Sequence, residues 1–442
     1  MVSLSALIIQ HVANIRRSRF DAMRILMELR SRLKRRSESE GPANVVDDKE
    51  AKKRSKRFIT SWLLCWAAAL VLISIVFFAI VAYPSKDKVA KYELPSRPSL
   101  KGPLAVNQKL KQAERLLQGS LIGPESLLVE GNKIYTGTQD GRILEIVDGK
   151  IERTLRLKEV KDGITCGTYD TEPICGRPLG IRRLNENELV IADAYLGIFI
   201  LNFDMMTSKQ IVEGGKMVAG APLKFLNDIE VLGPNYVVFS HSSTRWDRRD
   251  FMKEILQGVP TGRVLSVDPS TGALRVLIEK LSFANGIQLS PDRLSLLVAE
   301  TGMARIWRYH LGGPKAGKLE IFANNLPGLP DNIRLSSKGT FWVGMADVRR
   351  HGQFALLDFM SDKLYLRDVL LKITPNFAYS KLFPLFKARH ALLIELNANG
   401  EIISSMHDLM GEVITDISQV TESNGYLYLG SYHAAFIGKI KL

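Results

Sequence analysis

Six short apolar runs recur through the last three-quarters of the chain, and each ends in a small residue. A polar-to-apolar step precedes each run by roughly ten positions, and self-similarity at a period of about fifty residues with strand-like composition is typical of a β-propeller. We therefore predict an all-β fold, a six-bladed β-propeller, over residues 119–442. The runs are Ile134–Gly137, Leu189–Ala192, Val237–Ser240, Leu296–Ala299, Phe341–Gly344 and Leu427–Gly430. The steps are Glu125–Leu127, Leu179–Ile181, Asn227–Ile229, Asn285–Ile287, Asp331–Ile333 and Ser418–Val420.

Four of these steps begin with a residue that can bind a cation through oxygen. They are Glu125, Asn227, Asn285 and Asp331. Equivalent positions of all blades gather around the central axis of a propeller. We therefore expect these side chains to meet in space, although about two hundred residues separate the first from the last.

The chemistry of this set favours calcium. Calcium takes oxygen ligands, and the carboxylates of Glu125 and Asp331 would neutralise a divalent ion while Asn227 and Asn285 add neutral carbonyls. No cysteine and no histidine pair joins the set, which disfavours zinc and copper. The alternative is that these residues serve only the backbone of tight turns. Four of them at equivalent blade positions favour the calcium site.

A metal at this position could polarise an ester or lactone carbonyl, and hydrolysis would then need a proton acceptor nearby. His241 follows the third apolar run and His433 follows the sixth, so both are candidate catalytic bases. The alternative for each is a hydrogen-bonded structural histidine. No Gly-x-Ser-x-Gly elbow and no phosphate-binding glycine loop is present in the sequence, which disfavours serine hydrolases and nucleotide-dependent enzymes.

The spacing of the runs is irregular in one place. The fifth and sixth runs start 86 residues apart, at Phe341 and Leu427, which leaves an extra stretch at 347–390 that is rich in Leu and Phe. This stretch predicts either a helical insertion that packs against its own blade, or a lid or membrane-facing flap over the axial pocket.

A membrane span precedes the propeller. Residues 58–83 are 26 residues without a charge, and about 20 suffice to cross a bilayer. The basic cluster Lys52–Arg57 precedes the span, so the positive-inside rule predicts a cytosolic tail over 1–57 and a lumenal or extracellular remainder. This is the topology of a single-pass type II membrane protein with a signal anchor, in the endoplasmic reticulum or the plasma membrane. A cleaved signal peptide is disfavoured by the late start and the length of the segment.

Charge is concentrated at the N-terminus. The net charge is +14, and residues 1–57 carry 15 Lys+Arg against 7 Asp+Glu, or +8. This distribution argues against a nucleic-acid binder and for a membrane-flanking role. Residues 1–36 predict a basic amphipathic helix on an anionic membrane surface, or else a tail without a role. Residues 84–118, which contain Pro and Lys, are expected to form a stalk between the membrane and the propeller.

Two of the three cysteines are candidates for a disulfide. Cys166 and Cys175 are nine residues apart in a Gly- and Pro-containing segment, and an oxidising lumen would allow them to pair. A zinc site is less favoured, because two thiolates need two further ligands and no histidine lies nearby. Cys65 falls within the predicted span.

Several motifs of residues 95–442 resemble those of strictosidine synthase-like proteins and recur in the same order. The resemblance implies a six-bladed propeller with wider kinship to paraoxonases and gluconolactonases. It further implies that Glu125, Asn227, Asn285 and Asp331 occupy the calcium-ligand positions of those relatives, with Asn332 as a further ligand. The motifs are Cys175–Ile181, Ser242–Thr244, Thr261–Arg263, Asp268–Gly272, Gly313–Lys315 and Pro330–Ile333.

The chain departs from the plant synthase at the residue that is catalytic there. That enzyme uses a glutamate just before the first strand of the last blade, and this chain has Ser418 at the position. A serine cannot supply the acid–base chemistry of a carboxylate, so we expect no alkaloid synthesis. Asp416 is two residues away, displaced by about 6–7 Å along an extended segment, and is a poor substitute.

These observations predict a membrane-anchored, calcium-dependent hydrolase of small aryl esters or lactones. The rival interpretation is a non-catalytic, membrane-tethered receptor or scaffold that binds a protein partner and holds calcium structurally, since a propeller fold does not determine function. A hydrolase of a very different substrate is a third interpretation.

Overall fold

The computed structural model describes residues 47–83 and 88–442. The amphipathic helix expected at 1–36 lies outside the described residues, as does most of the predicted tail. The first described element is α2 (Asp47–Ala82). Between Lys52 and Ala79 it is long and apolar enough to cross a membrane, and it is the one such helix in the described part of the chain. The compact unit that follows begins at Tyr83.

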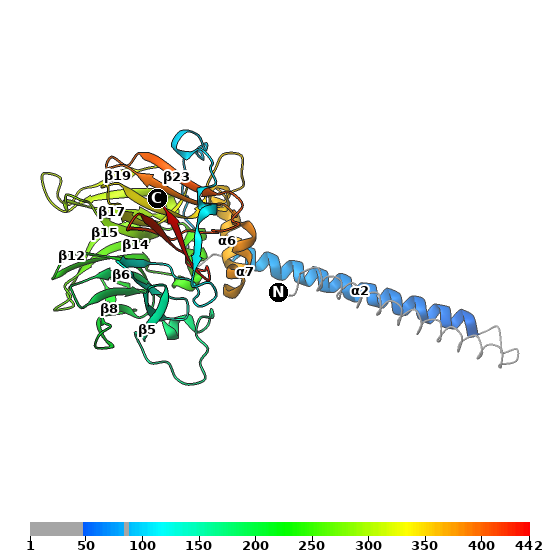
Figure 1. Ribbon diagram of the computed structural model, residues 1–442. Helices are drawn as coiled ribbons and strands as arrows, with labels where there is room; N and C mark the ends of the chain where they lie inside the picture. Colours follow the sequence, from blue (N-terminus) through cyan, green and yellow to red (C-terminus); the bar gives the residue numbers. More distant parts are fainter. Residues whose placement is uncertain (1–46, 84–87) are drawn as a thin grey trace. The chain divides into compact units, whose positions relative to one another are not determined.

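Residues 114–441 form a six-bladed β-propeller, as the sequence predicts (Figure 1). Each blade is a four-stranded antiparallel sheet, and in five blades the four strands follow one another along the chain. The five are β2 (Leu127–Glu130), β3 (Lys133–Gly137), β4 (Arg142–Val147) and β5 (Lys150–Arg156); β6 (Pro178–Arg183), β7 (Leu189–Asp193), β8 (Gly197–Asn202) and β9 (Thr207–Glu213); β12 (Phe225–Gly233), β13 (Tyr236–Ser243), β14 (Gly262–Val267) and β15 (Leu274–Leu281); β16 (Ala284–Leu289), β17 (Ser295–Glu300), β18 (Arg305–His310) and β19 (Leu319–Ala323); β20 (Gly328–Leu335), β21 (Phe341–Val348), β22 (Ala391–Leu396) and β23 (Ile402–Asp408).

The sixth blade closes the ring with strands from both ends of the propeller sequence. It consists of β24 (Gln419–Ser423), β25 (Tyr426–Gly430), β26 (Ile437–Lys441) and, at its outer edge, β1 (Glu114–Leu116). The expected stalk at 84–118 is therefore corrected, because its C-terminal end is a strand of the propeller. Leu104 and Leu110 of the same stretch are buried in the propeller core. This closure ties the two ends of the propeller together without a covalent link.

Apolar side chains between neighbouring sheets form the core. The strands β7 and β13 belong to adjacent blades, and Val190, Ala192, Val237 and Phe239 from these strands are fully buried in one cluster. Consecutive first strands contact one another around the axis, and β24 contacts β2. The two apolar faces of each sheet explain why the sequence shows continuous apolar runs rather than strict alternation.

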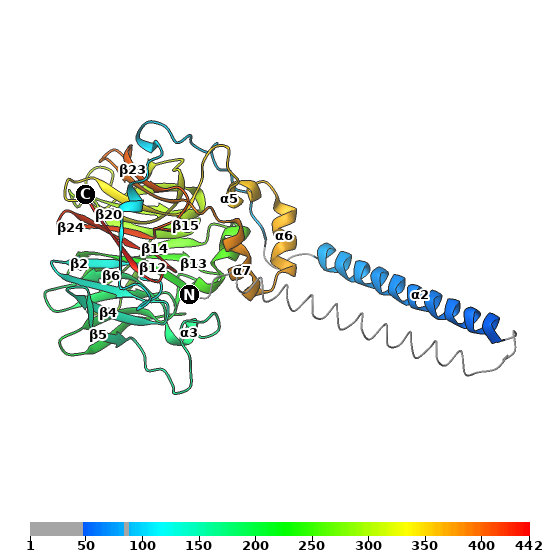
Figure 2. The same cartoon turned by 45° about the vertical axis from the view of Figure 1, so that its right-hand side comes forward.

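The stretch at 347–390 is helical. It forms α5 (Leu356–Met360), α6 (Leu364–Ile373) and α7 (Asn376–Phe386) between β21 and β22, and the three helices lie together at one end of the propeller (Figure 2). They pack against α4 (Phe251–Gln257), which belongs to a different blade, between β13 and β14. The insertion therefore does not pack only against its own blade.

The remaining short elements are α3 (Glu172–Cys175), η1 (Gly102–Leu104), η2 (Lys109–Gln112), η3 (Arg248–Asp250), η4 (Thr301–Met303), β10 (Met217–Val218) and β11 (Ala221–Pro222).

Glycine is required where first strands approach one another near the axis. A Cβ on Gly286 would lie 2.5 Å from Cα of Asn332 and 2.6 Å from the carbonyl oxygen of Asp331. Since both atoms belong to backbone, we expect Gly286→Ala to lower the free energy of unfolding by about 1–3 kcal/mol. Gly233→Ala is the matched control, because no atom lies within 4 Å of its Cβ position. Chemical denaturation of both variants measures the difference, and equal midpoints would contradict the expectation.

Candidate functional site

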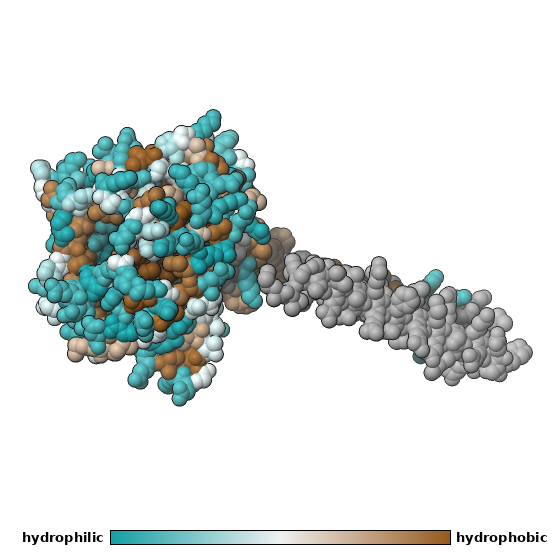
Figure 3. Space-filling model, viewed as in Figure 1, coloured by the Kyte–Doolittle hydropathy of each residue, from teal (hydrophilic) through white to brown (hydrophobic). Residues whose placement is uncertain are grey.

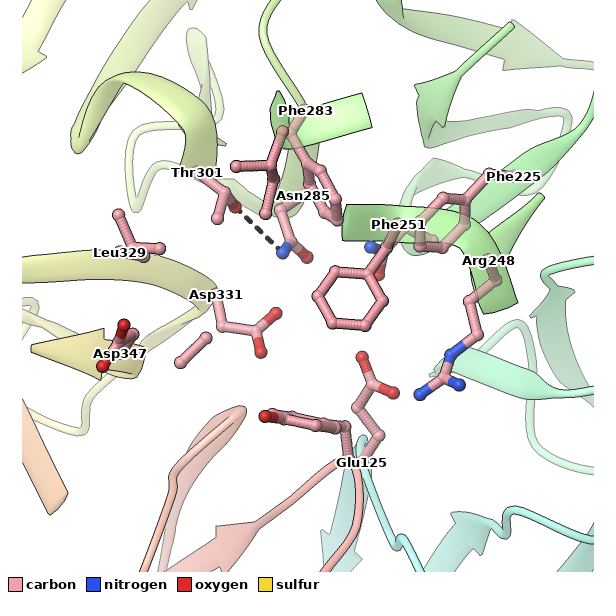
Figure 4. A pocket seen from close by; sticks show the side chains of 14 residues that line it. Glu125, Phe225, Arg248, Phe251, Phe283, Asn285, Thr301, Leu329, Asp331 and Asp347 are labelled. Carbon is pink, nitrogen blue, oxygen red and sulfur yellow. Dashed lines mark hydrogen bonds between the residues drawn. The ribbon is translucent and has the colours of Figure 1, made fainter. Parts of the chain in front are cut away.

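Polar side chains within or just before the first strands surround a cavity of about 70 Å³ at one end of the axis. Glu125, Asn227, Asn285 and Asp331 all line it, and each is at least 95% buried. Figure 4 shows the oxygens of Glu125, Asn285 and Asp331 turned toward a common space. The structure thus brings together all four residues that the repeat pattern selected.

A β-bulge positions three of the four side chains. The strands β12, β16 and β20 each lose their regular pairing with the next strand at the place where they carry Asn227, Asn285 and Asp331. A bulge bends the strand and redirects a side chain, and bulges are common beside functional sites. The same irregularity in three blades turns three oxygens toward the axis.

The two asparagines are held by their amide nitrogens. Nδ2 of Asn227 donates to Oγ of Ser242 at 3.0 Å, and Nδ2 of Asn285 donates to Oγ1 of Thr301 at 3.0 Å. Both amides therefore present Oδ1 on the other side. A buried acceptor without a partner costs about 1–3 kcal/mol. Within the described residues, Oδ1 is buried without a hydrogen-bond partner in Asn227, Asn285, Asp331 and Asn332.

Negative charge is concentrated at the same place. Burial raises the pKa of Asp331 well above its usual value, and the charge of Glu125 raises it further. Two cations of the protein lie close, since Nη2 of the buried Arg177 is 3.3 Å from Oε2 of Glu125 and Arg248 lines the same cavity. Unpartnered oxygens beside two carboxylates make a donor set that fits a hard divalent cation such as calcium. Asn332 is adjacent but does not line the cavity, and its backbone nitrogen donates to Ser418 at 2.8 Å.

Aromatic side chains form the wall of the cavity, and a larger pocket adjoins it. Phe225 and Phe283 contact each other edge to face, with ring centroids 5.5 Å apart. The outer pocket measures about 400 Å³ and shares Arg248, Phe251 and Tyr432 with the inner cavity. These three residues therefore stand between the carboxylates and the larger space outside.

His433 lies in the wall of the outer pocket and is about half exposed. Its Nε2 is 2.9 Å from Oδ2 of Asp416, which also forms an ion pair with Lys387. Burial lowers the pKa of Lys387 to about 8, against the opposing effect of nearby carboxylates. Nζ of Lys387 donates to the hydroxyl of Tyr432 at 2.7 Å. Hydrogen bonds thus connect the histidine to a residue of the inner cavity.

His241 lies elsewhere, and the catalytic role expected for it does not fit its surroundings. The side chain is fully buried and lines neither the cavity nor the outer pocket. Its Nε2 accepts a hydrogen bond from the backbone nitrogen of Lys224 at 3.0 Å, and Nε of Arg263 is 3.3 Å from Nδ1. Burial, together with the charge of Arg263, lowers its pKa to about 3. These contacts are those of a neutral, structural histidine.

Several residues of the site carry no signal in the repeat pattern. Arg248 and Phe251 come from the helical segment between β13 and β14, which lies outside the repeated apolar runs. Tyr432 lies two residues after the last apolar run, and its position beside His433 was the one feature that could have drawn attention to it. Arg177 belongs to the motif Cys175–Ile181, where its charge is hidden among apolar residues.

The cysteine pairing predicted from the spacing is confirmed, since Cys166 and Cys175 form a disulfide. It closes the segment between β5 and β6, from which Thr168, Tyr169 and Glu172 line the outer pocket. Arg248 donates to both carboxylate oxygens of Glu172, at 3.2 and 3.1 Å. The disulfide therefore supports one wall of that pocket.

Comparison with known proteins identifies the family. Residues 227–314 match the family model of strictosidine synthase, and residues 102–146 match that of the strictosidine synthase-like N-terminal region. The solved structure of the calcium-binding protein regucalcin from Agrobacterium tumefaciens is similar, with a TM-score of 0.47 and 12% identity over 74% of this chain and 92% of that one.

The curated relatives are more similar than the solved structure. Adipocyte plasma membrane-associated protein from Gallus gallus is 39% identical, over 89% of this chain and 93% of that protein. The protein of the same name from Homo sapiens is 37% identical, over 91% of this chain and 96% of that protein. These names and the apolar helix α2 fit a membrane-associated protein. The chain belongs to the adipocyte plasma membrane-associated protein family of strictosidine synthase-like propellers.

Proposed function

We propose that the protein is a membrane-anchored, calcium-dependent hydrolase of small aryl esters or lactones. The observation that carries the proposal is the group of buried oxygens without hydrogen-bond partners, which includes those of Asn227, Asn285 and Asp331. A buried polar atom without a partner calls for an explanation. A cation explains all of them together, whereas turn geometry would explain them only one at a time.

Glu125, Asn227, Asn285 and Asp331 would hold the ion. When bound, calcium would polarise the carbonyl of an ester or lactone as a Lewis acid. The aromatic rings of Phe225 and Phe283 would exclude water from the site, which strengthens electrostatic interactions there. The acyl or aryl group would occupy the outer pocket of about 400 Å³, a size within the usual range for small-molecule sites.

The candidate base is His433, with Asp416 as the residue that positions it. We expect His433→Gln to lower kcat for aryl ester hydrolysis by about 100-fold, because a neutral imidazole near its partner carboxylate can accept a proton. The pH profile of the variant should lose one ionisation, which a merely structural role would not change. His351→Gln is the control, since His351 is exposed and lines neither pocket. Equal pH profiles of wild type and His433→Gln would exclude His433 as the base.

The direct test is turnover by the full-length protein in detergent or vesicles. Phenyl acetate and a small aromatic lactone are offered with calcium, then after chelation, then after calcium is restored. The proposal expects turnover that disappears on chelation and returns with calcium. A folded protein without turnover of either substrate would contradict the hydrolase.

A non-catalytic propeller with structural calcium is the second candidate. The small volume of the inner cavity, about 70 Å³, favours it, because ligand pockets usually measure several hundred Å³. In that case calcium would raise the melting temperature of the protein without any turnover. The chain would then act as a tethered receptor or scaffold.

The proposed topology is type II. The cluster Lys52–Arg57 carries five basic residues at the N-terminal side of the apolar segment of α2, which favours a cytosolic N-terminus. The disulfide between Cys166 and Cys175 fits a lumenal or extracellular propeller. Protease treatment of sealed microsomes tests this, since only the N-terminal tail should be cleaved.

A further inference from the structure

The helical insertion between β21 and β22 exposes an unusual amount of apolar surface. Ten large apolar side chains of residues 354–386 are exposed, and Leu385 reaches 75%. On the part of the propeller seen in Figure 3, by contrast, apolar side chains are interspersed with hydrophilic ones. A concentration of this kind marks a surface that contacts a membrane or another protein. The ten, here called the apolar face, are Phe354, Phe359, Leu364, Tyr365, Leu366, Ile373, Phe377, Leu382, Leu385 and Phe386.

Aromatic contacts within the apolar face join the start of the insertion to its end. The ring centroid of Phe354 is 5.5 Å from that of Phe359 and 6.5 Å from that of Phe386. The other side of the same helices is buried, where Met360 and Tyr379 pack with Met252 of α4. The helices therefore already pack against α4 with one side, and the exposed apolar residues lie outside that buried core.

Hydrogen bonds hold α6 against the segment that follows α2 in the chain. The guanidinium of the buried Arg367 donates to the backbone oxygen of Ala90 at 2.7 Å and to that of Leu256 at 3.1 Å. The backbone nitrogen of Ala90 in turn donates to Gln257 at 2.8 Å. These bonds attach the insertion to Ala90 as well as to α4.

Ala90 is only eight residues beyond Ala82, where α2 ends. A fully extended chain advances at most about 3.6 Å per residue, so eight residues span no more than about 29 Å. That distance is about the thickness of the hydrocarbon core of a bilayer. Covalent geometry therefore keeps Ala90, to which Arg367 of α6 is hydrogen-bonded, within about one bilayer thickness of the end of the helix that we propose as the span.

We propose that the apolar face is a membrane-docking surface and that its occupant is the bilayer that α2 spans. The short tether favours this occupant over a second protein, because the bilayer is always within reach. The composition agrees, since α7 contains no acidic residue and its one charged residue is the exposed Lys381. Aromatic and aliphatic side chains with a flanking lysine are typical of helices that lie in a membrane interface.

Docking would also bring the site close to the lipid. Phe251 and Ile255 of α4 line the inner cavity and pack among the residues that hold the insertion. Under the proposed function, substrates dissolved in the bilayer would then reach the site more readily than substrates in water. The docking surface itself does not depend on whether the protein hydrolyses anything.

The test uses the full-length chain with Cys65→Ser, since Cys65 is the free cysteine of the described residues. Leu385→Cys and, in a separate sample, Met205→Cys are labelled with an environment-sensitive fluorophore. Met205 is 71% exposed in the turn between β8 and β9. That turn joins the third and fourth strands of a blade, whereas the insertion joins the second and third, so the two labels lie at opposite ends of the propeller.

The labelled proteins are reconstituted in phosphatidylcholine vesicles with and without brominated acyl chains. We expect bromolipid to remove most of the fluorescence at position 385 and to leave that at position 205 unchanged. Equal quenching at the two positions would overturn the proposal. A label at 385 that is shielded from aqueous iodide yet not quenched by bromolipid would also overturn it, and would point to a second copy or a protein partner instead. Because the measurement needs no turnover, failure of the docking surface is distinguishable from failure of the hydrolase.

Discussion

Asp331→Asn and Glu125→Gln are each expected to abolish calcium-dependent ester hydrolysis, with a loss of at least about 100-fold, because even residues that only orient metal ligands contribute about 10–100-fold. Each substitution removes one negative charge and preserves the size of the side chain. Both carboxylates line the inner cavity and are at least 95% buried. Initial rates with phenyl acetate at saturating calcium measure the loss.

A second measurement separates loss of metal from loss of chemistry. Calcium at about 100 times its dissociation constant should stabilise the wild type by about 2.7 kcal/mol, and either variant should lose this gain in thermal unfolding. Asp162→Asn is the control, since Asp162 is exposed and does not line the cavity. Calcium stabilisation that survives both substitutions would show that the ion binds elsewhere.

Asp228→Asn is expected to lower the free energy of unfolding by about 3–5 kcal/mol, which is the usual cost of removing one partner of a buried ion pair. The two oxygens of Asp228 accept hydrogen bonds from Arg334 at 2.7 and 2.9 Å, and both side chains are buried. Oδ2 also accepts from the backbone nitrogen of Ile287 at 2.8 Å. The pair therefore joins three first strands at the axis. Denaturant unfolding in the presence of a chelator measures the effect without a contribution from calcium.

The control for this prediction is the more exposed pair of Arg183 and Glu130, where Glu130→Gln should lower the free energy of unfolding by no more than about 1 kcal/mol.

The buried pair also predicts that the free energy of unfolding falls at acid pH. Burial acts to raise the pKa of Asp228, but the charges of Arg334 and Arg182 hold it below its usual value. A carboxyl whose pKa is lower in the folded protein stabilises the fold when the pH is above its pKa in the unfolded chain, which is about 3.9. This stabilisation is lost as the pH falls through the pKa of the folded state. The wild type should therefore lose this contribution below about pH 4, and Asp228→Asn should not. Similar unfolding free energies for Asp228→Asn and Glu130→Gln would contradict the prediction.

The repeat pattern predicted the blade number and the gathering of Glu125, Asn227, Asn285 and Asp331. It succeeded because each blade buries both faces of its sheet, so every blade leaves the same apolar run in the sequence. Equivalent positions then meet at the axis by symmetry. The disulfide was predictable for a different reason, since Cys166 and Cys175 are close in the chain.

The pattern could not distinguish between the two histidines. His241 and His433 both follow an apolar run, yet one is enclosed by Lys224 and Arg263 and the other lies beside Asp416 in the outer pocket. A strand directs successive side chains to opposite faces, and a bulge changes that alternation by one residue. The direction of a single side chain near a bulge therefore depends on the three-dimensional pairing.

By itself, then, the sequence determined the architecture, the apolar segment and the four oxygen-bearing positions, because these depend on local periodicity and composition. The tertiary structure alone decided that β1 completes the last blade, that Arg334 binds Asp228 at the axis, and that the insertion packs on α4. Each of these contacts joins residues at least about a hundred positions apart. Nothing in a local pattern encodes such a contact, because its energy exists only once the ring has closed and water has been excluded.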